Sequence, residues 1–146
     1  MNLKKNKIMC WHCNKNEFHI QIAEKDTEVY KMLIKDKEDN LVSVVFSQFP
    51  WQQGFLYKSS LDIKLTWYMG DYEFQGKQGF HSYIRKPIYH PSLGAYSYDL
   101  KFRPCTVYPS GCYLVKCVIP KGYSYCVNES GEVISDALKF IEIINE

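Results

Sequence analysis

Apolar and polar residues alternate one by one along several stretches of this chain. In residues 17–23, Phe18, Ile20 and Ile22 fall on one face of an extended strand, and His19 and Gln21 fall on the other. Residues 63–69 repeat the pattern, with Ile, Leu, Trp and Met alternating with Lys, Thr and Tyr. Because successive side chains of a strand point to opposite faces, this period of two predicts β-strands.

The composition favours strands as well. The 146 residues include 3 Trp, 12 Tyr and 8 Phe, but alanine occurs only at positions 23, 95 and 137. Aromatic residues suit a pleated, half-buried surface, whereas alanine is the best helix former. We therefore expect a mainly β fold, β-rich α+β at most: one compact antiparallel sheet or a small barrel or sandwich, with long aromatic-rich loops and at most one or two short helices.

The clearest local unit is a β-hairpin. Two apolar runs, residues 29–35 and 41–46, flank the polar residues 36–40, which are turn formers. Residues 72–74 and 80–84 are expected to form a second hairpin, or a strand pair near one edge. Further strands are expected at residues 55–58, 63–69, 113–119, 123–127 and 137–144.

Residues 87–109 are the least regular stretch. They hold Pro87, Pro91, Pro104 and Pro109 among several tyrosines, so we expect an ordered, aromatic-rich loop without secondary structure of its own. Short helices at residues 92–98 or 135–141 are the alternatives to strand and loop.

The length, charge and hydropathy of the chain indicate how many domains it has and which classes of partner it can bind. A chain of this size fits one domain, which we place at residues 17–146, after a loosely held N-terminal segment at residues 1–16. The net charge of +2 is too small for a groove that follows duplex DNA. The sequence contains no apolar run long enough for a membrane span and no secretory signal, so we expect a cytoplasmic protein.

The N-terminal segment contains the spacing of a metal knuckle. Cys10 and Cys13 form a C-x2-C pair, which lets two thiolates reach one Zn²⁺. His12 or His19 offers a third ligand and Cys105 or Cys112 a fourth, but no second C-x2-C is present. The alternative is a pair of ordinary thiols, and we expect no cofactor other than this zinc.

Several segments resemble small uncharacterised proteins of gut Bacteroides-type bacteria and their phages. The resemblance covers most of residues 29–144, and it rests on residues 29–33, 79–83, 115–122 and 131–136. It implies a phage or mobile-element accessory protein, for which blocking a host defence protein or sequestering a nucleotide signal would be a natural role. It implies no particular chemistry.

The densest polar and aromatic cluster lies at residues 79–86. In a strand, His81, Tyr83 and Arg85 share one face, which places an imidazole, a phenol and a guanidinium in a row. Such a row can stack a nucleobase and pair with a phosphate, although a solvated tyrosine ladder is the alternative. The predicted ligand contacts are Trp51, Trp67, His81, Tyr83, Arg85, Lys86 and His90.

The same stretch also resembles ADP-ribosyltransferase-like domains. That resemblance implies an NAD site with His81, Tyr96 or Tyr98, and Glu132 as its functional residues. Other catalytic motifs, such as a phosphate loop or a nucleophile elbow, are absent from the sequence.

The leading functional hypothesis is a non-catalytic protein that binds a small nucleotide-like ligand or a host protein, with self-association left open. The alternatives are an ADP-ribosyltransferase-like enzyme and a structural or assembly protein of a phage.

Overall fold

The computed structural model describes residues 11–44, 50–58, 66–69, 73–98 and 106–144. Strands make up most of the described chain, and a three-residue 3-10 helix is the only helix in it, so the expected mainly β fold is confirmed. No helix in these ranges is long and apolar enough to cross a membrane. The elements are β1 (His12–Asn14), η1 (Lys15–Glu17), β2 (Gln21–Ile22), β3 (Thr27–Lys35), β4 (Leu41–Ser43), β5 (Leu56–Lys58), β6 (Thr66–Met69), β7 (Glu73–Gln78), β8 (Phe80–Tyr83), β9 (Ile88–His90), β10 (Ala95–Tyr98), β11 (Thr106–Val107), β12 (Tyr113–Ile119), β13 (Ser124–Val127), β14 (Glu132–Ser135) and β15 (Ala137–Ile144).

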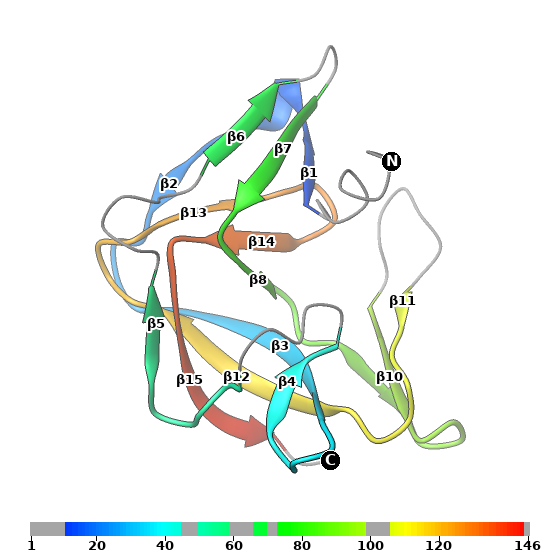
Figure 1. Ribbon diagram of the computed structural model, residues 1–146. Helices are drawn as coiled ribbons and strands as arrows, with labels where there is room; N and C mark the ends of the chain where they lie inside the picture. Colours follow the sequence, from blue (N-terminus) through cyan, green and yellow to red (C-terminus); the bar gives the residue numbers. More distant parts are fainter. Residues whose placement is uncertain (1–10, 45–49, 59–65, 70–72, 99–105, 145–146) are drawn as a thin grey trace, which may run out of the picture.

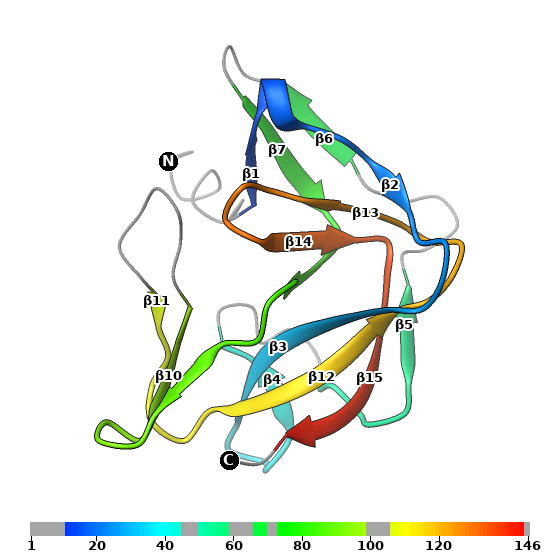
Figure 2. The same cartoon turned by 180° about the vertical axis from the view of Figure 1, so that it is seen from behind.

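The strands form one large antiparallel sheet and two small ones. The large sheet has the order β2-β13-β14-β8-β3-β12-β15-β5, and β4 pairs with β3 beside this path. Its two ends, β2 and β5, are not paired with each other, so the sheet is not a closed barrel. The small sheets have the orders β1-β7-β6 and β11-β10-β9. Figures 1 and 2 show the first of these at one end of the molecule and β10 and β11 to one side of the large sheet.

Strand β3 lies in the middle of the large sheet. It pairs along its length with β12, and its last residues pair with β4 in the predicted hairpin. The carboxylate of Asp36 accepts hydrogen bonds from the backbone amides of Glu38 and Asn40 and so closes the turn. This hairpin and the strands at residues 113–119 and 137–144 are confirmed.

The main core covers one face of this sheet. Val29, Leu33, Val115, Leu138 and Phe140 are each at most 1% exposed there. The other face of β3 and β12 carries Met32 and Leu114, which belong to a second, tyrosine-rich cluster. Strand alternation thus makes β3 apolar on both faces, and the second face lies under the small β9–β10–β11 sheet.

The hairpin predicted from residues 72–74 and 80–84 is wrong. Strands β7 and β8 follow each other directly, but β7 pairs with β1 and β6, whereas β8 pairs with β14 and β3. Gly79 joins them with a φ of +137°, a backbone conformation that L side chains rarely adopt. The chain therefore passes from one sheet to the next at this glycine instead of turning back.

The loop predicted at residues 87–109 is also wrong in part, because β9, β10 and β11 lie within it. The prolines bound these strands: Pro87 precedes β9, Pro91 follows it and Pro109 comes soon after β11. Both alternative helices are wrong as well, since residues 95–98 form β10 and residues 137–144 form β15. Two tyrosines of this stretch, Tyr96 and Tyr108, instead pack against Met32 and Leu114 on the second face of the large sheet.

Three further differences concern short strands. The strand expected at residues 17–23 is limited to β2, at the sheet edge, where Ile20 and Ile22 are 41% and 63% exposed. Strand β14 follows the turn at residues 128–131, and β1 lies in the N-terminal segment; neither was expected from the sequence. Short strands of three or four residues give too few alternations to be recognised.

The described part of the N-terminal segment is packed against the large sheet. Trp11 is 1% exposed, and its Nε1 donates a hydrogen bond of 2.8 Å to the carbonyl oxygen of Glu132. The side-chain amide of Asn128 donates to the carbonyl oxygen of His12 at 2.8 Å. Residues 11–13 are therefore fixed to the β13–β14 hairpin, while Cys10 lies outside the described residues.

Candidate functional site: a tyrosine-lined pocket

The small β9–β10–β11 sheet covers the second face of β3 and β12 with tyrosines. Tyr89 and Tyr96 are paired across β9 and β10, so their side chains share one face of this sheet. Their ring centroids lie 5.0 Å apart with an interplanar angle of 57°. Tyr96 and Tyr108 are buried with Met32 and Leu114, which joins the two sheets through an apolar contact.

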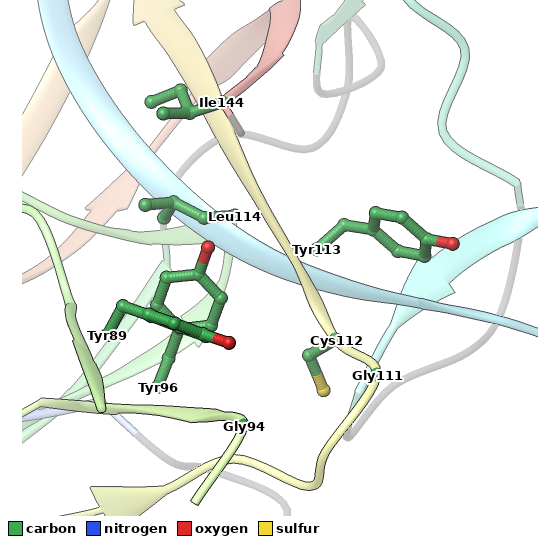
Figure 3. Close-up of a pocket in the computed structure, with 8 residues that line it drawn as sticks. All are labelled: Tyr89, Gly94, Tyr96, Gly111, Cys112, Tyr113, Leu114 and Ile144. Atoms are coloured by element: carbon green, nitrogen blue, oxygen red, sulfur yellow. The ribbon is translucent and has the colours of Figure 1, made fainter. Parts of the chain in front are cut away.

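A pocket of about 300 Å³ opens at one end of this contact. It is lined by Tyr89, Gly94, Tyr96, Gly111, Cys112, Tyr113, Leu114 and Ile144. Figure 3 shows the side chains of Tyr89, Tyr96, Cys112, Leu114 and Ile144 on one side of β12. The ring of Tyr113 points to the opposite side, where it packs on the main core.

Two loops form the rim of the pocket. Gly94 ends the turn between β9 and β10, with its amide donating to the carbonyl oxygen of His90 at 2.9 Å, and Gly111 precedes β12. Both have a positive φ, +63° and +91°, which glycine adopts without strain. The glycines keep the rim free of side chains, so the space beside Tyr89 and Tyr96 stays accessible.

The pocket is lined by aromatic, aliphatic and glycine residues, and polar atoms make up at least as much of its exposed surface as apolar ones. The lining residues in the described ranges carry no charged side chain, and the polar atoms they offer are phenol hydroxyls, backbone groups and the Cys112 thiol. Burial raises the pKa of that thiol, so it stays protonated at neutral pH and acts as a weak donor rather than a nucleophile.

A second group of aromatic side chains continues from the pocket toward β14. The rings of Tyr83 and Tyr98 are stacked with centroids 4.0 Å apart, and the guanidinium carbon of Arg85 lies 4.9 Å from the centre of the Tyr98 ring. The hydroxyls of Tyr83 and Tyr108 hydrogen-bond to each other. Burial raises the pKa of both Tyr98 and Tyr108, so these phenols are neutral.

This stack is tied to the turn between β13 and β14. The Tyr98 hydroxyl donates a hydrogen bond to the carbonyl oxygen of Gly131 at 3.3 Å. A guanidinium nitrogen of Arg85 donates to the carbonyl oxygen of Ser130, also at 3.3 Å. Glu132, next in the chain, accepts from the side-chain amide of Asn128 at 2.9 Å. We call the contacting side chains of Tyr83, Tyr98 and Tyr108 the tyrosine layer. Arg85 is thus fixed at the surface, on the outer side of the tyrosine layer.

The predicted ligand contacts lie in several different places. Tyr83 and Arg85 come together on Tyr98. Trp51 is buried in the main core, on the other face of β3, where its Nε1 donates to Ser43 Oγ at 3.1 Å. The structure therefore places Trp51 apart from the tyrosine layer.

The remaining predicted contacts are the three basic residues and Trp67. His81 is half-buried; burial and the neighbouring Lys31 lower the pKa of its imidazole to about 4, so it is neutral. Lys86 is exposed, and His90 Nε2 lies 2.7 Å from Ser97 Oγ in a hydrogen bond. The side chain of Trp67, on β6, lies outside the described part of the chain. Of the six predicted contacts with described side chains, none lines the pocket.

The residues of the enzyme alternative are spread over two sheets. In the large sheet, His81 pairs with Ile134 and Glu132 pairs with Tyr83, so His81 and Glu132 lie two residues apart in register. Tyr96 lies in the small sheet and lines the pocket with Tyr89. The tyrosine whose hydroxyl is bonded to the turn beside Glu132 is Tyr98.

The main pocket residues that were not expected to contact a ligand are Tyr89, Cys112, Leu114 and Ile144; Cys112 was expected only as a metal ligand. They come from β9, from β12 with the residue just before it, and from β15, which are three separate parts of the chain. The available signal was the high tyrosine content of residues 83–98, which indicated an aromatic surface but not its partner strand.

No family model matches the chain, and neither a curated protein nor a solved structure matches it.

Proposed function

We propose that the protein binds a small, flat, uncharged ring, such as a nucleobase or nucleoside, in the pocket beneath the β9–β10–β11 sheet. The observation that carries this proposal is the pair of tyrosines, Tyr89 and Tyr96, beside an apolar floor of Leu114 and Ile144. Rings stack on aromatic side chains without regard to base identity, at about 1–3 kcal/mol per base. The pocket volume of about 300 Å³ lies at the small end of the range for ligand sites.

The absence of charge among the described lining residues restricts the ligand further. A phosphate inside this pocket would lose its hydration without gaining a cation, which is costly. The ring of a nucleotide can occupy the pocket only if its phosphates remain in solvent. We therefore expect nucleosides and free bases to bind at least as well as the corresponding nucleotides.

The proposal predicts thermal stabilisation by the ligand. A ligand at 100 times its Kd adds about 2.7 kcal/mol to the free energy of unfolding. For a domain of this size that shift raises Tm by about 5–10 °C. A panel of bases, nucleosides and mono-, di- and cyclic nucleotides, measured by differential scanning fluorimetry, identifies the class that binds.

The Cys112→Phe variant tests the location. A phenyl ring at this half-buried position fills the space beside Tyr96, so the variant should lose the ligand-induced shift. The Cys112→Ala variant keeps the pocket open and should retain it. Binding that is equal in both variants places the ligand elsewhere. If no member of the panel binds, a protein partner becomes the better hypothesis, and consumption of NAD by the pure protein would favour the enzyme alternative.

A further inference from the structure

Strand β2 forms one end of the large sheet and lies at the periphery of the molecule in Figures 1 and 2. It pairs with β13, where the amide of Ala23 donates to the carbonyl oxygen of Tyr123 at 3.0 Å. Because an antiparallel strand bonds its neighbour through every second residue, Gln21 also bonds to β13, and Ile20 and Ile22 direct their backbone groups away from it. No other described strand pairs with β2, so these amides and carbonyls form an open edge.

The side chains of the two isoleucines are exposed as well, 41% for Ile20 and 63% for Ile22. By strand alternation they lie on the same face as Phe18, which packs against a small buried cluster. This cluster consists of Trp11, Cys13, Cys126 and Ile134. Cys13, one of the predicted zinc ligands, lies in it as a buried thiol that contacts Cys126. The isoleucines therefore continue an apolar face out to the edge of the sheet.

Other edge strands of the protein carry residues that hinder pairing. Strand β5, at the opposite end of the large sheet, contains Lys58, and β9 lies between Pro87 and Pro91. A lysine or a proline on an edge strand opposes the addition of another strand. Residues 18–23 contain no Lys, Arg, Asp, Glu, Pro or Gly. The β2 edge is therefore suited to strand addition.

The order of residues along this edge fits a second copy of the same chain. Two β2 strands that meet antiparallel about a twofold axis at Gln21 set Ile20 of each copy opposite Ile22 of the other. Both residues direct their backbone groups outward, so each facing pair exchanges two hydrogen bonds, and the two copies form four. The exposed isoleucine side chains then cover each other across the axis.

The charges that flank the edge favour the same register. With the axis at Gln21, Glu17 of one copy and Lys25 of the other occupy matching positions, and both are exposed. An axis at Ile20 would instead match Lys15 with Lys25, which carry the same charge. Charge complementarity of this kind fixes the register of an interface more than it adds affinity.

We propose that β2 is a dimerisation edge, through which two copies of this chain pair about a twofold axis at Gln21 and join their large sheets into one. The contact is short, so it belongs with the small interfaces that form weak, concentration-dependent complexes. Strand β2 contributes no residue to the tyrosine-lined pocket, so each copy in the dimer keeps its pocket accessible.

Sedimentation velocity on the full chain tests the association. We expect a shift from monomer to dimer as the concentration rises from about 10 µM to about 1 mM. The Ile22→Lys variant carries two added charges per dimer, one on each side of the axis, and should raise the Kd of the dimer about 10-fold or more. The control is Ile88→Lys, because Ile88 is 57% exposed on β9 between two prolines. It should dimerise like the wild type.

Disulfide trapping tests the register. With the axis at Gln21, the two copies of this residue face each other as a non-hydrogen-bonded pair with Cα atoms about 4.5 Å apart, within the range for a disulfide. Oxidised glutathione should therefore link Gln21→Cys into covalent dimers. The exposed Glu24→Cys, three residues from the axis, should stay at the level of the wild type.

Three results would overturn the proposal. They are a wild type that stays monomeric at about 1 mM, an Ile22→Lys variant that dimerises like the wild type, and equal cross-linking of Gln21→Cys and Glu24→Cys. Concentration-dependent growth beyond the dimer would also overturn it, because a twofold contact closes on itself, whereas pairing of β2 with a different edge produces open chains.

Discussion

The Gly131→Ala variant is expected to lose about 3 kcal/mol of its free energy of unfolding. Gly131 has a φ of +86°, and a Cβ atom added there would lie 2.4 Å from the Tyr98 hydroxyl and 2.6 Å from an Arg85 amine. The guanidinium group of Arg85 can move aside. Tyr98 cannot move easily, because it is 2% exposed and its ring is stacked on Tyr83. The variant must therefore strain its backbone and also displace the tyrosine layer. Chemical denaturation of the two proteins measures the difference.

A matched glycine separates the two causes. Gly122 has a similar φ of +95°, but an added Cβ would meet no atom within 4 Å, so Gly122→Ala should cost only the backbone strain, about 1 kcal/mol. Removing the Tyr98 hydroxyl should relieve the contact. In the Tyr98→Phe background, the cost of Gly131→Ala is therefore expected to approach that of Gly122→Ala. An unchanged cost in that background would show that the tyrosine layer is not held at this turn.

The long strands of the fold could be predicted from the sequence, and a short strand paired with a distant segment could not. Strands β3, β12 and β15 were recognised because each has seven or more residues with strong apolar character. The β3–β4 hairpin followed from a polar run between two apolar ones. Strand β14 has four residues, and its partner β8 comes from a distant part of the chain, so neither periodicity nor turn chemistry indicated the pairing.

The sites were predicted less well than the strands for a related reason. Alternation predicted that Tyr83 and Arg85 share one strand face; β8 ends at Tyr83, and Arg85, in the bend that follows, reaches the ring of Tyr98 on which Tyr83 is stacked. The pocket depends on which sheet covers β12, and the Cys13–Cys126 contact depends on where β1 docks. Both are contacts between distant segments, for which a single sequence carries no local signal.

Lys31 is the clearest case of a residue whose role emerges only from packing. On β3 it lies between Val29 and Leu33 and faces the main core, where it is 9% exposed. Its ammonium group donates to the carbonyl oxygen of His81 at 2.8 Å and lies 5.1 Å from the centre of the Trp51 ring. Burial lowers the pKa of Lys31 to about 8, with a smaller opposing effect from Cys117. At neutral pH Lys31 is charged, so its burial on folding lowers the free energy of unfolding.

The sign of the resulting pH dependence follows from proton binding. Between pH 8 and pH 10.5 the unfolded chain holds the Lys31 proton and the folded protein does not. The contribution of Lys31 to stability is therefore least favourable below pH 8 and rises with pH through this window, by about 3 kcal/mol. Buried thiols and phenols with raised pKa act in the opposite direction at high pH, so the wild-type curve alone does not isolate Lys31.

Comparison with the Lys31→Met variant removes the thiols and phenols that are common to both proteins; the Lys31 charge also lowers the pKa of the Cys117 thiol, so the difference reports Lys31 together with its coupling to Cys117. Methionine has a similar volume and no charge, so the free energy of unfolding of the variant relative to wild type should be highest near pH 7. That difference should fall by about 3 kcal/mol by pH 10.5, as measured by urea denaturation at each pH. Lys35→Met is the control: Lys35 follows Lys31 on the same face of β3, but its side chain is 44% exposed. Its substitution should change stability by less than about 0.5 kcal/mol throughout. A difference for Lys31→Met that stays flat across this window would mean that the Lys31 ammonium is solvated in the folded protein, and that the main core is open at Trp51.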